Sequence, residues 1–253
     1  MDRRLAEHQR DWNDLALLDP LWAIASVPDR RHGAWDDDEF MATGRRKVAS
    51  IARRLDLLGA PAARRRALDF GCGVGRLTIP LADHFHEAVG LDVAPAMVDQ
   101  ARARASAAGR DDVRFMLNER DDLQVLDGER FDLVFTALVL QHLPSREQVS
   151  RCARALAGLV APGGVLMAQM PSRLAPWARL QPRRRAYAAL RSAGVPPAVL
   201  YGRLGLHPMR LLAFPRAAFE ALLEGEGLQV AAVSARRRGA SLSCTYLALR
   251  PGA

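Results

Sequence analysis

The segment LDFGCGVGR, residues 68–76, is the most informative stretch of the sequence. A short apolar run predicts a buried strand, and Gly71, Gly73 and Gly75 follow it in a Gly-x-Gly-x-Gly turn. Glycines in such a turn permit positive φ angles and leave room for a ligand beside the backbone. The dinucleotide fingerprint instead needs Gly-x-Gly-x-x-Gly, and Arg76 stands where its third glycine would lie. The segment therefore predicts a ligand-binding loop and disfavours a nicotinamide-dependent dehydrogenase.

An acidic residue at the end of the next predicted strand gives a second signal. Asp92 closes the run at 88–92, seventeen residues past Gly75. A carboxylate at this place can accept hydrogen bonds from both hydroxyls of an unphosphorylated ribose. The two signals together predict an adenosine-type cofactor at the carboxyl edge of a parallel sheet.

The pattern from Arg66 onward alternates between short buried strands and amphipathic helices, which is typical of a parallel sheet with helical crossovers. The predicted strands are 67–70, 88–92, 113–117, 131–136 and 165–170, and the predicted helices are 77–84, 95–107 and 146–160. After Pro171 the alternation lapses for some forty residues, which we interpret as an insertion of short helices. A helix at 217–224, strands at 228–234 and 243–249, and a turn around 236–240 complete the chain. The last two strands are too close for a helical crossover, so we expect them to pair antiparallel.

At these residues the sequence resembles the class I S-adenosylmethionine-dependent methyltransferases, most closely over 68–171. The resemblance implies a seven-stranded Rossmann-like α/β sheet in the order 3-2-1-4-5-7-6, parallel except for the last strand, with a helical cap. It implies S-adenosylmethionine as the cofactor. The expected organisation is an N-terminal helical cap (1–60), a cofactor-binding core (61–171), a helical lid (172–212) and the C-terminal part of the core (213–253).

The resemblance also assigns roles to residues around the loop. In the family, the positions that match Asp69, Gly71, Gly73 and Gly75 surround the methionine part and the ribose. The acid that matches Asp92 binds the ribose hydroxyls, and the positions that match Val93 and Met97 flank the adenine. An acid or amide after the third strand touches the adenine amino group, and four residues compete for this role: Asn118, Glu119, Asp121 and Asp122.

The loop after the fourth strand resembles the one that faces the transferred methyl group, and in it Leu138 and His142 are expected to lie beside the cofactor. A hydroxyl or amine acceptor must lose a proton, and neutral histidine is a suitable base. His142 is one candidate and His207, at the close of the insertion, is another. Packing near the methionine part is the alternative role for His142, and a surface position is the alternative for His207. Nothing in the sequence singles out His8.

Composition narrows the class of protein further. The chain has 253 residues, 49% of them hydrophobic and 25% charged, which fits a globular protein with a sizeable core. No apolar stretch approaches the roughly 20 residues of a membrane-spanning helix, and no secretion signal is recognisable. The three cysteines match no metal-ligand spacing, so we expect reduced thiols, a cytoplasmic protein and no metal site.

The net charge of +8 is carried almost wholly by arginine, with triplets at 64–66, 183–185 and 236–238. For the first and third triplets, charge exposed to solvent is a sufficient explanation. The middle triplet shares its segment with aromatic residues, so a lid with an apolar face and a basic rim would suit an anionic or amphiphilic acceptor, or a membrane surface. Candidate walls of the acceptor pocket, all equally explicable as packing, are Trp12, Trp22, Trp35, Phe40, Trp177 and Tyr187.

These observations predict a methyltransferase for a small molecule, most simply O-methylation of a natural product, sugar or glycolipid. An RNA or protein methyltransferase is the alternative within the enzyme class, although no separate nucleic-acid-binding module is visible. A scaffold that binds the cofactor without catalysis is the alternative outside it. Monomer and homodimer both stay open.

Overall fold

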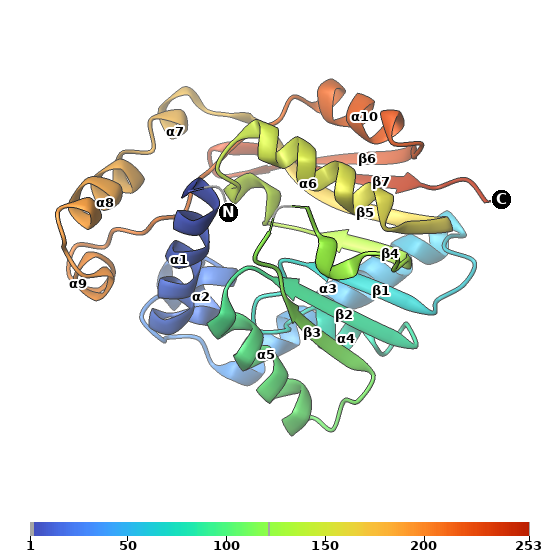
Figure 1. The fold of residues 1–253 in the computed structure, drawn as a ribbon, viewed down its shortest axis with the longest axis horizontal. Helices are drawn as coiled ribbons and strands as arrows, with labels where there is room; N and C mark the ends of the chain where they lie inside the picture. The colour runs from blue at the N-terminus through green and yellow to red at the C-terminus, as the bar shows by residue number, and fades with distance from the viewer. Residues whose placement is uncertain (1–2, 121, 253) are drawn as a thin grey trace.

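A seven-stranded sheet forms the centre of the computed structural model, which describes residues 3–120 and 122–252 (Figure 1). The strands lie in the order β3-β2-β1-β4-β5-β7-β6, as the resemblance implies. Their bounds are β1 Arg66–Phe70, β2 Glu87–Asp92, β3 Val113–Leu117, β4 Phe131–Thr136, β5 Val160–Leu174, β6 Gln229–Arg238 and β7 Ser241–Leu249. β1 to β5 pair parallel, and β7 runs antiparallel to both of its neighbours, β5 and β6.

Side chains alternate between the two faces of the sheet, and each face has its own apolar core. Leu68 and Val134 pack in the cluster that includes α6 (Arg146–Gly158) and α10 (Arg216–Gly225). Their neighbours Ala67 and Leu133 pack on the opposite face, where the helices α3 (Asp37–Leu58) and α4 (Thr78–Leu81) lie. α5 (Pro95–Ala107) packs against β3.

α3 lies in the segment expected to form the N-terminal cap, but it packs against the sheet instead. The helix begins at Asp36, whose side chain accepts a hydrogen bond from the Glu39 N–H, and ends at Gly59 with a φ of 66°. Val48, Ile51 and Leu55 lie on one stripe of the helix and pack under the sheet. The second half of the predicted 1–60 cap is therefore a layer of the core.

Several predicted elements differ from the observed ones. The helix expected at 77–84 is only the single turn α4. β5 begins five residues earlier than expected, where Val160 pairs with Phe131 of β4, and ends four residues later, because β7 pairs with it as far as Leu174. The turn predicted at 236–240 is wrong for the arginine triplet: Arg236 and Arg237 pair in register with Ser243 and Leu242, and the chain reverses at Gly239 and Ala240.

Six of the remaining helices in the described residues form a cap over the carboxyl ends of the central strands (Figure 1), and the short η2 (Gln124–Leu126) and η3 (Leu140–His142) follow β3 and β4. From the N-terminal part come α1 (Arg3–Leu18), α2 (Pro20–Ile24) and η1 (Pro28–Arg30), and from the insertion come α7 (Pro176–Leu180), α8 (Pro182–Ser192) and α9 (Pro197–Gly202). The buried carboxylate of Asp19 accepts a hydrogen bond from the Tyr201 hydroxyl at 2.5 Å. The Arg31 guanidinium lies over both Trp22 and Tyr201. The two halves of the cap are therefore tied together.

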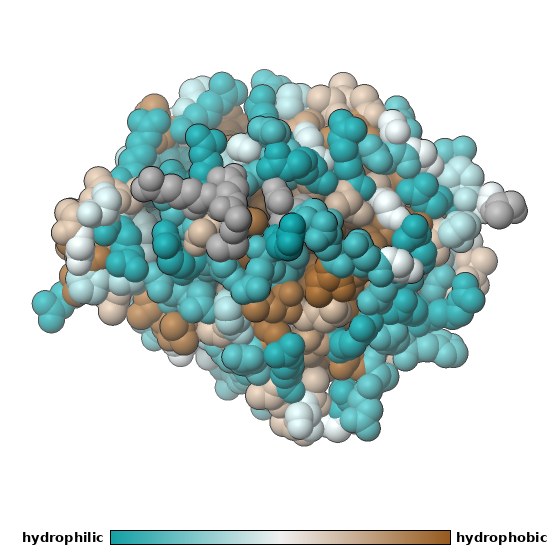
Figure 2. Space-filling view, in the orientation of Figure 1, coloured by the Kyte–Doolittle hydropathy of each residue, from teal (hydrophilic) through white to brown (hydrophobic). Residues whose placement is uncertain are grey.

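The surface in Figure 2 is largely hydrophilic, with apolar residues scattered among charged ones. The exposed large apolar side chains include Leu57 and Trp177, which lie far apart in the sequence. Within the described residues, no helix combines the length and the apolar character that crossing a membrane requires.

Candidate functional site

A cavity of about 440 Å³ lies where the carboxyl ends of β1, β2 and β4 meet the cap. Its floor is the glycine loop and the segments after β2 and β4. Its cover is α1 and the stretch 207–211 at the close of the insertion. This volume falls in the range of small-molecule pockets. Two parts of the chain about 200 residues apart therefore close over a site that the sheet edge builds.

The glycine loop presents bare backbone to this cavity. Gly71 and Gly73 have φ angles of 79° and 54°, which an L side chain rarely adopts. A Cβ atom at Gly71 would lie 2.1 Å from a methyl of Val139, and one at Gly73 would lie 2.4 Å from the terminal methyl of Ile24. Gly75, with a φ of 83°, does not line the cavity; a Cβ there would meet the ring of Phe115.

Asp92 lies at the end of β2 and lines the cavity. Its two carboxylate oxygens accept hydrogen bonds from the backbone N–H groups of Gly73 at 2.8 Å and Ala94 at 2.9 Å. Loss of solvent raises the pKa of Asp92, and these N–H groups oppose the shift. Each carboxylate oxygen can accept about two hydrogen bonds, so one acceptor place on each is left for a ligand.

Asp69 and Cys72 support the loop from within. The buried carboxylate of Asp69 accepts a hydrogen bond from the Thr78 hydroxyl at 2.7 Å, and burial raises its pKa to about 6. Burial also raises the pKa of the Cys72 thiol well above its ordinary value, which leaves it unreactive. Both residues line the cavity.

The residues after β2 and β3 surround one end of the cavity. Val93, Met97 and Asn118 line it, and the Asn118 side chain is buried with no hydrogen bond to another described residue. Its amide therefore keeps hydrogen-bonding capacity that a ligand in the cavity can use. Glu119 and Asp122, the rival candidates, are exposed and lie outside the lining, although Arg120 and Leu123 beside them belong to it. Asp121 lies outside the described residues.

The loop after β4 borders the other end. Leu138 lines the cavity with a φ of 64°, and its N–H donates to the Gln169 side-chain oxygen at 2.8 Å. His142 Nδ1 lies 2.5 Å from the Arg210 carbonyl oxygen, and its Nε2 lies 3.1 Å from the Gln141 side-chain nitrogen. Since a carbonyl only accepts, Nδ1 carries the proton and Nε2 accepts from Gln141. Loss of solvent lowers the pKa of His142 to about 4.

His207 also lines the cavity, as one of its two expected roles requires. Its ring lies edge-on to Trp22, with the ring centres 5.6 Å apart. Its Nδ1 atom is buried without a hydrogen-bond partner. Loss of solvent, with the nearby Arg31 and Arg183, lowers its pKa to about 4.

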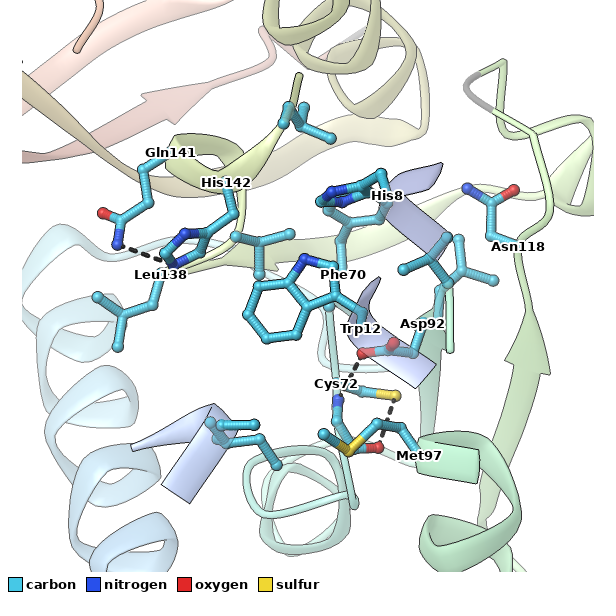
Figure 3. Close-up of a pocket in the computed structure, with 18 of the residues that line it drawn as sticks. His8, Trp12, Phe70, Cys72, Asp92, Met97, Asn118, Leu138, Gln141 and His142 are labelled. Atoms are coloured by element: carbon cyan, nitrogen blue, oxygen red, sulfur yellow. Dashed lines mark hydrogen bonds between the residues drawn. The ribbon is translucent and has the colours of Figure 1, made fainter. Parts of the chain in front are cut away.

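The sequence reasoning missed His8. It is buried on α1, lines the cavity, and burial lowers its pKa to about 3. Figure 3 shows Trp12 in the middle of the pocket between His8 and His142, with ring centres 6.2 Å and 5.3 Å away. The available signal was the stripe of Leu5, His8, Trp12 and Leu15, spaced as on one face of a helix.

Of the predicted aromatic walls, Trp12 alone lines this cavity. Trp22, Trp35 and Phe40 pack together within the cap, where they join one apolar cluster. Trp177 is 68% exposed. Tyr187 lines a second, polar cavity of about 450 Å³ between α1 and α8.

No group of three residues able to bind a metal ion occurs within residues 3–120 and 122–252. The groups that line the cavity and can contact a ligand are the glycine loop, the carboxylates, the amide, the histidines and the arginines.

Comparison with known proteins agrees with this geometry. Residues 68–166 match the family model described as a methyltransferase domain. A trans-aconitate 2-methyltransferase from Methylobacterium radiotolerans is 38% identical over 169 residues, which cover 63% of this chain and 57% of that protein. A ubiquinone biosynthesis O-methyltransferase from Xanthomonas euvesicatoria is 29% identical over 159 residues, which cover 63% and 59%. The chain thus spans less than two thirds of the length of these curated relatives.

A solved structure resembles nearly the whole chain. The magnesium protoporphyrin IX methyltransferase from Synechocystis with bound SAH has a TM-score of 0.63 and 20% identity, covering 97% of this chain and 99% of that one. At this identity the likeness concerns the fold.

The strand order, the glycine loop and the acid after β2 together define a Rossmann-like methyltransferase core. Residues 68–166 match a methyltransferase domain and the relatives named above are methyltransferases, so this part of the chain is similar to the class I S-adenosylmethionine-dependent methyltransferases.

Proposed function

We propose that the protein transfers the methyl group of S-adenosylmethionine to an oxygen atom of a small molecule. The observation that carries this proposal is the continuity of the cavity. One space extends from Asp92 and Asn118 to Trp12 and His142 beneath the cap. A nucleotide donor and a small acceptor would therefore meet in a shielded site, as an in-line displacement needs.

The end of the cavity at Asp92 and Asn118, here called the donor half, fits the cofactor. When bound, S-adenosylmethionine supplies a methyl group on a sulfonium that needs no further activation. Asp92 would accept the ribose hydroxyls with its remaining lone pairs, and the unpaired Asn118 amide would meet the adenine. Gly71 and Gly73, which line the cavity and pack closely against Val139 and Ile24, would border the rest of the molecule with their backbone.

The end of the cavity at Trp12 and His142, here called the acceptor half, positions and shields its ligand. Trp12 offers an apolar wall, and the low pKa values of His8, His142 and His207 keep all three rings neutral. The Nε2 lone pair of His142 is taken by Gln141, so we assign to His142 the orientation of its loop. His207 keeps a buried, unpaired Nδ1 with which it can hold the acceptor.

A nucleic-acid or protein acceptor is less well supported. The cavity is covered by α1 on one side and by 207–211 on the other, so a polymer would have to thread beneath the cap. A cofactor-binding scaffold would need no acceptor half at all.

Release of S-adenosylhomocysteine from S-adenosylmethionine, measured with a library of small acceptors and with RNA and protein, tests the proposal. We expect turnover with small molecules only. Trp12→Ala should raise the KM of the acceptor about tenfold or more, because an aromatic wall is lost, and change the KM of the cofactor little. Trp177→Ala, which changes an exposed residue outside the cavity, is the matched control. Turnover with polymers alone, or none with any acceptor despite cofactor binding, would contradict the proposal.

A further inference from the structure

One charged residue of the cavity lacks a partner. The other charged side chains of the lining are held by the protein: Asp69 by Thr78, Asp92 by two backbone N–H groups, Arg76 by Thr43 at 3.1 Å, and Arg120 by Asp122 at 3.2 Å. The guanidinium of Arg210 makes no hydrogen bond or ion pair with any residue in the described part of the chain.

Arg210 is placed to act on a ligand. Arg210 lines both the main cavity and the polar cavity next to it, and its carbonyl holds His142. It is partly buried, and loss of solvent, with the nearby Arg184, lowers its pKa. An ionised group that gives up water without a counter-charge costs free energy, which an anionic ligand would offset.

The nearby acids do not provide that counter-charge at contact distance. Asp11 and Glu7 attract Arg210 from α1, but neither forms an ion pair with it within 4 Å. Burial raises the pKa of Asp11 to about 6, which shows that its own charge is poorly compensated. Arg184, which is near enough to Asp11 to act against the rise of its pKa, has a buried Nε atom without a partner. Arg210 and Arg184 therefore both keep guanidinium N–H donors without a partner among the described residues.

The cavity also lacks a strong base. His8, His142 and His207 have pKa values of about 3, 4 and 4, so each is a weak proton acceptor near pH 7. A hydroxyl or amine acceptor would have to give its proton to one of these rings or to a carboxylate of the lining, and Asp69 and Asp92 are already held by Thr78 and by two backbone N–H groups. A carboxylate is already ionised at that pH and has no proton to lose.

We propose that the methyl acceptor is a small carboxylic acid whose carboxylate is held by Arg210 and is methylated to a methyl ester. The planar guanidinium matches the two carboxylate oxygens, and each oxygen keeps a further lone pair for attack. That lone pair forms the new oxygen–carbon bond while the sulfur–methyl bond breaks and its electron pair stays on sulfur. The products are a neutral ester and S-adenosylhomocysteine, and no proton is transferred. The inference rests on the proposed methyl transfer.

The test uses aliphatic and aromatic monocarboxylic acids, each with its primary amide and its alcohol. Ester formation is measured by mass spectrometry. We expect esters from acids and no methylated product from the amides or alcohols. The rate should be nearly constant between pH 7 and 9, because neither the nucleophile nor the histidines titrate there and Asp11 and Asp69, with pKa values of about 6, are already ionised.

Arg210→Gln should raise the KM of the acid about 30-fold or more. Arg210→Lys should restore part of this loss, because lysine returns the positive charge but not the planar guanidinium that contacts both carboxylate oxygens. Affinity for S-adenosylhomocysteine should change less than twofold in both, which shows that the core is folded. Arg203→Gln changes an exposed arginine outside both cavities and is the matched control.

An unchanged KM in Arg210→Gln overturns the inference, as does methylation of alcohols or amides while every acid stays unmodified. Absence of an ester from the whole panel also overturns it. Failure to bind S-adenosylmethionine would instead count against the proposed function, so the two failures are distinguishable.

Discussion

The histidines of the acceptor half are the residues whose chemistry depends most on burial. His8 has a pKa of about 3 in the folded chain, against about 6.5 for an exposed histidine. The folded state therefore binds fewer protons than the unfolded chain below about pH 6.5. Its contribution to stability is complete above that pH and is lost as the pH falls towards 3.

Replacement of this residue gives a prediction at the same scale. Between pH 7.5 and pH 5 the wild type should lose about 2 kcal/mol more unfolding free energy than His8→Gln, since the variant has no imidazole to protonate on unfolding. Urea unfolding at the two pH values measures the difference. Equal losses in both proteins would show that His8 is not held neutral.

The comparison of two variants isolates His8 from other titrating groups. Asp11 and Asp69 have pKa values of about 6, above their ordinary value, so they act in the opposite direction over an overlapping pH range. Their effect is common to both proteins and cancels.

Sequence pattern identified some of these residues and not others. Asp92 was predictable because a strand end and a glycine loop fix its place locally, and the structure puts it in the cavity. His8 and Arg210 were not singled out, because their positions depend on how two distant segments of the cap pack. Glu119 and Asp122 were reasonable candidates for the adenine contact, yet both are exposed, while their neighbours Asn118, Arg120 and Leu123 line the cavity.

The glycine loop is the element on which the cofactor half depends. Gly71→Ala adds a methyl group 2.1 Å from Val139 at a residue with positive φ. We expect a loss of about 1–3 kcal/mol of stability from overpacking and a marked fall in affinity for S-adenosylhomocysteine. Thermal unfolding and calorimetric titration measure the two effects.

Gly109→Ala is the matched control for this prediction. Gly109 also has a positive φ, 61°, but a Cβ there would meet nothing within 4 Å. It should show only the cost of backbone strain and bind the nucleotide normally. If Gly71→Ala behaved like Gly109→Ala, the close packing of the loop would not be needed for binding.

Elements of the core were the most predictable part of the fold. The helix Pro95–Ala107 and the strands Val113–Leu117 and Phe131–Thr136 have the expected bounds, since buried apolar runs and a proline at the helix start determine them locally. β5 and β6 are longer than expected because their ends are set by pairing with β4 and β7. Pairing between strands is not visible in a local pattern.

At the scale of the whole molecule, the order of the sheet could be predicted from the sequence and the arrangement of the cap could not. The order of seven strands followed from the resemblance, and the structure confirms it. The arrangement of the cap did not follow, because 1–60 divides between a core layer, α3, and the cover of the cavity. The central claim concerns the whole assembly: the sheet edge binds S-adenosylmethionine.

Calorimetric titration of the protein with S-adenosylmethionine, S-adenosylhomocysteine and NAD, repeated with Asp92→Ala, tests this claim most directly. We expect micromolar binding of the two sulfur nucleotides, no binding of NAD, and a loss of at least tenfold in the variant, because the ribose hydroxyls lose their acceptor. A preference for NAD, or equal affinity of the wild type and Asp92→Ala, would contradict the account.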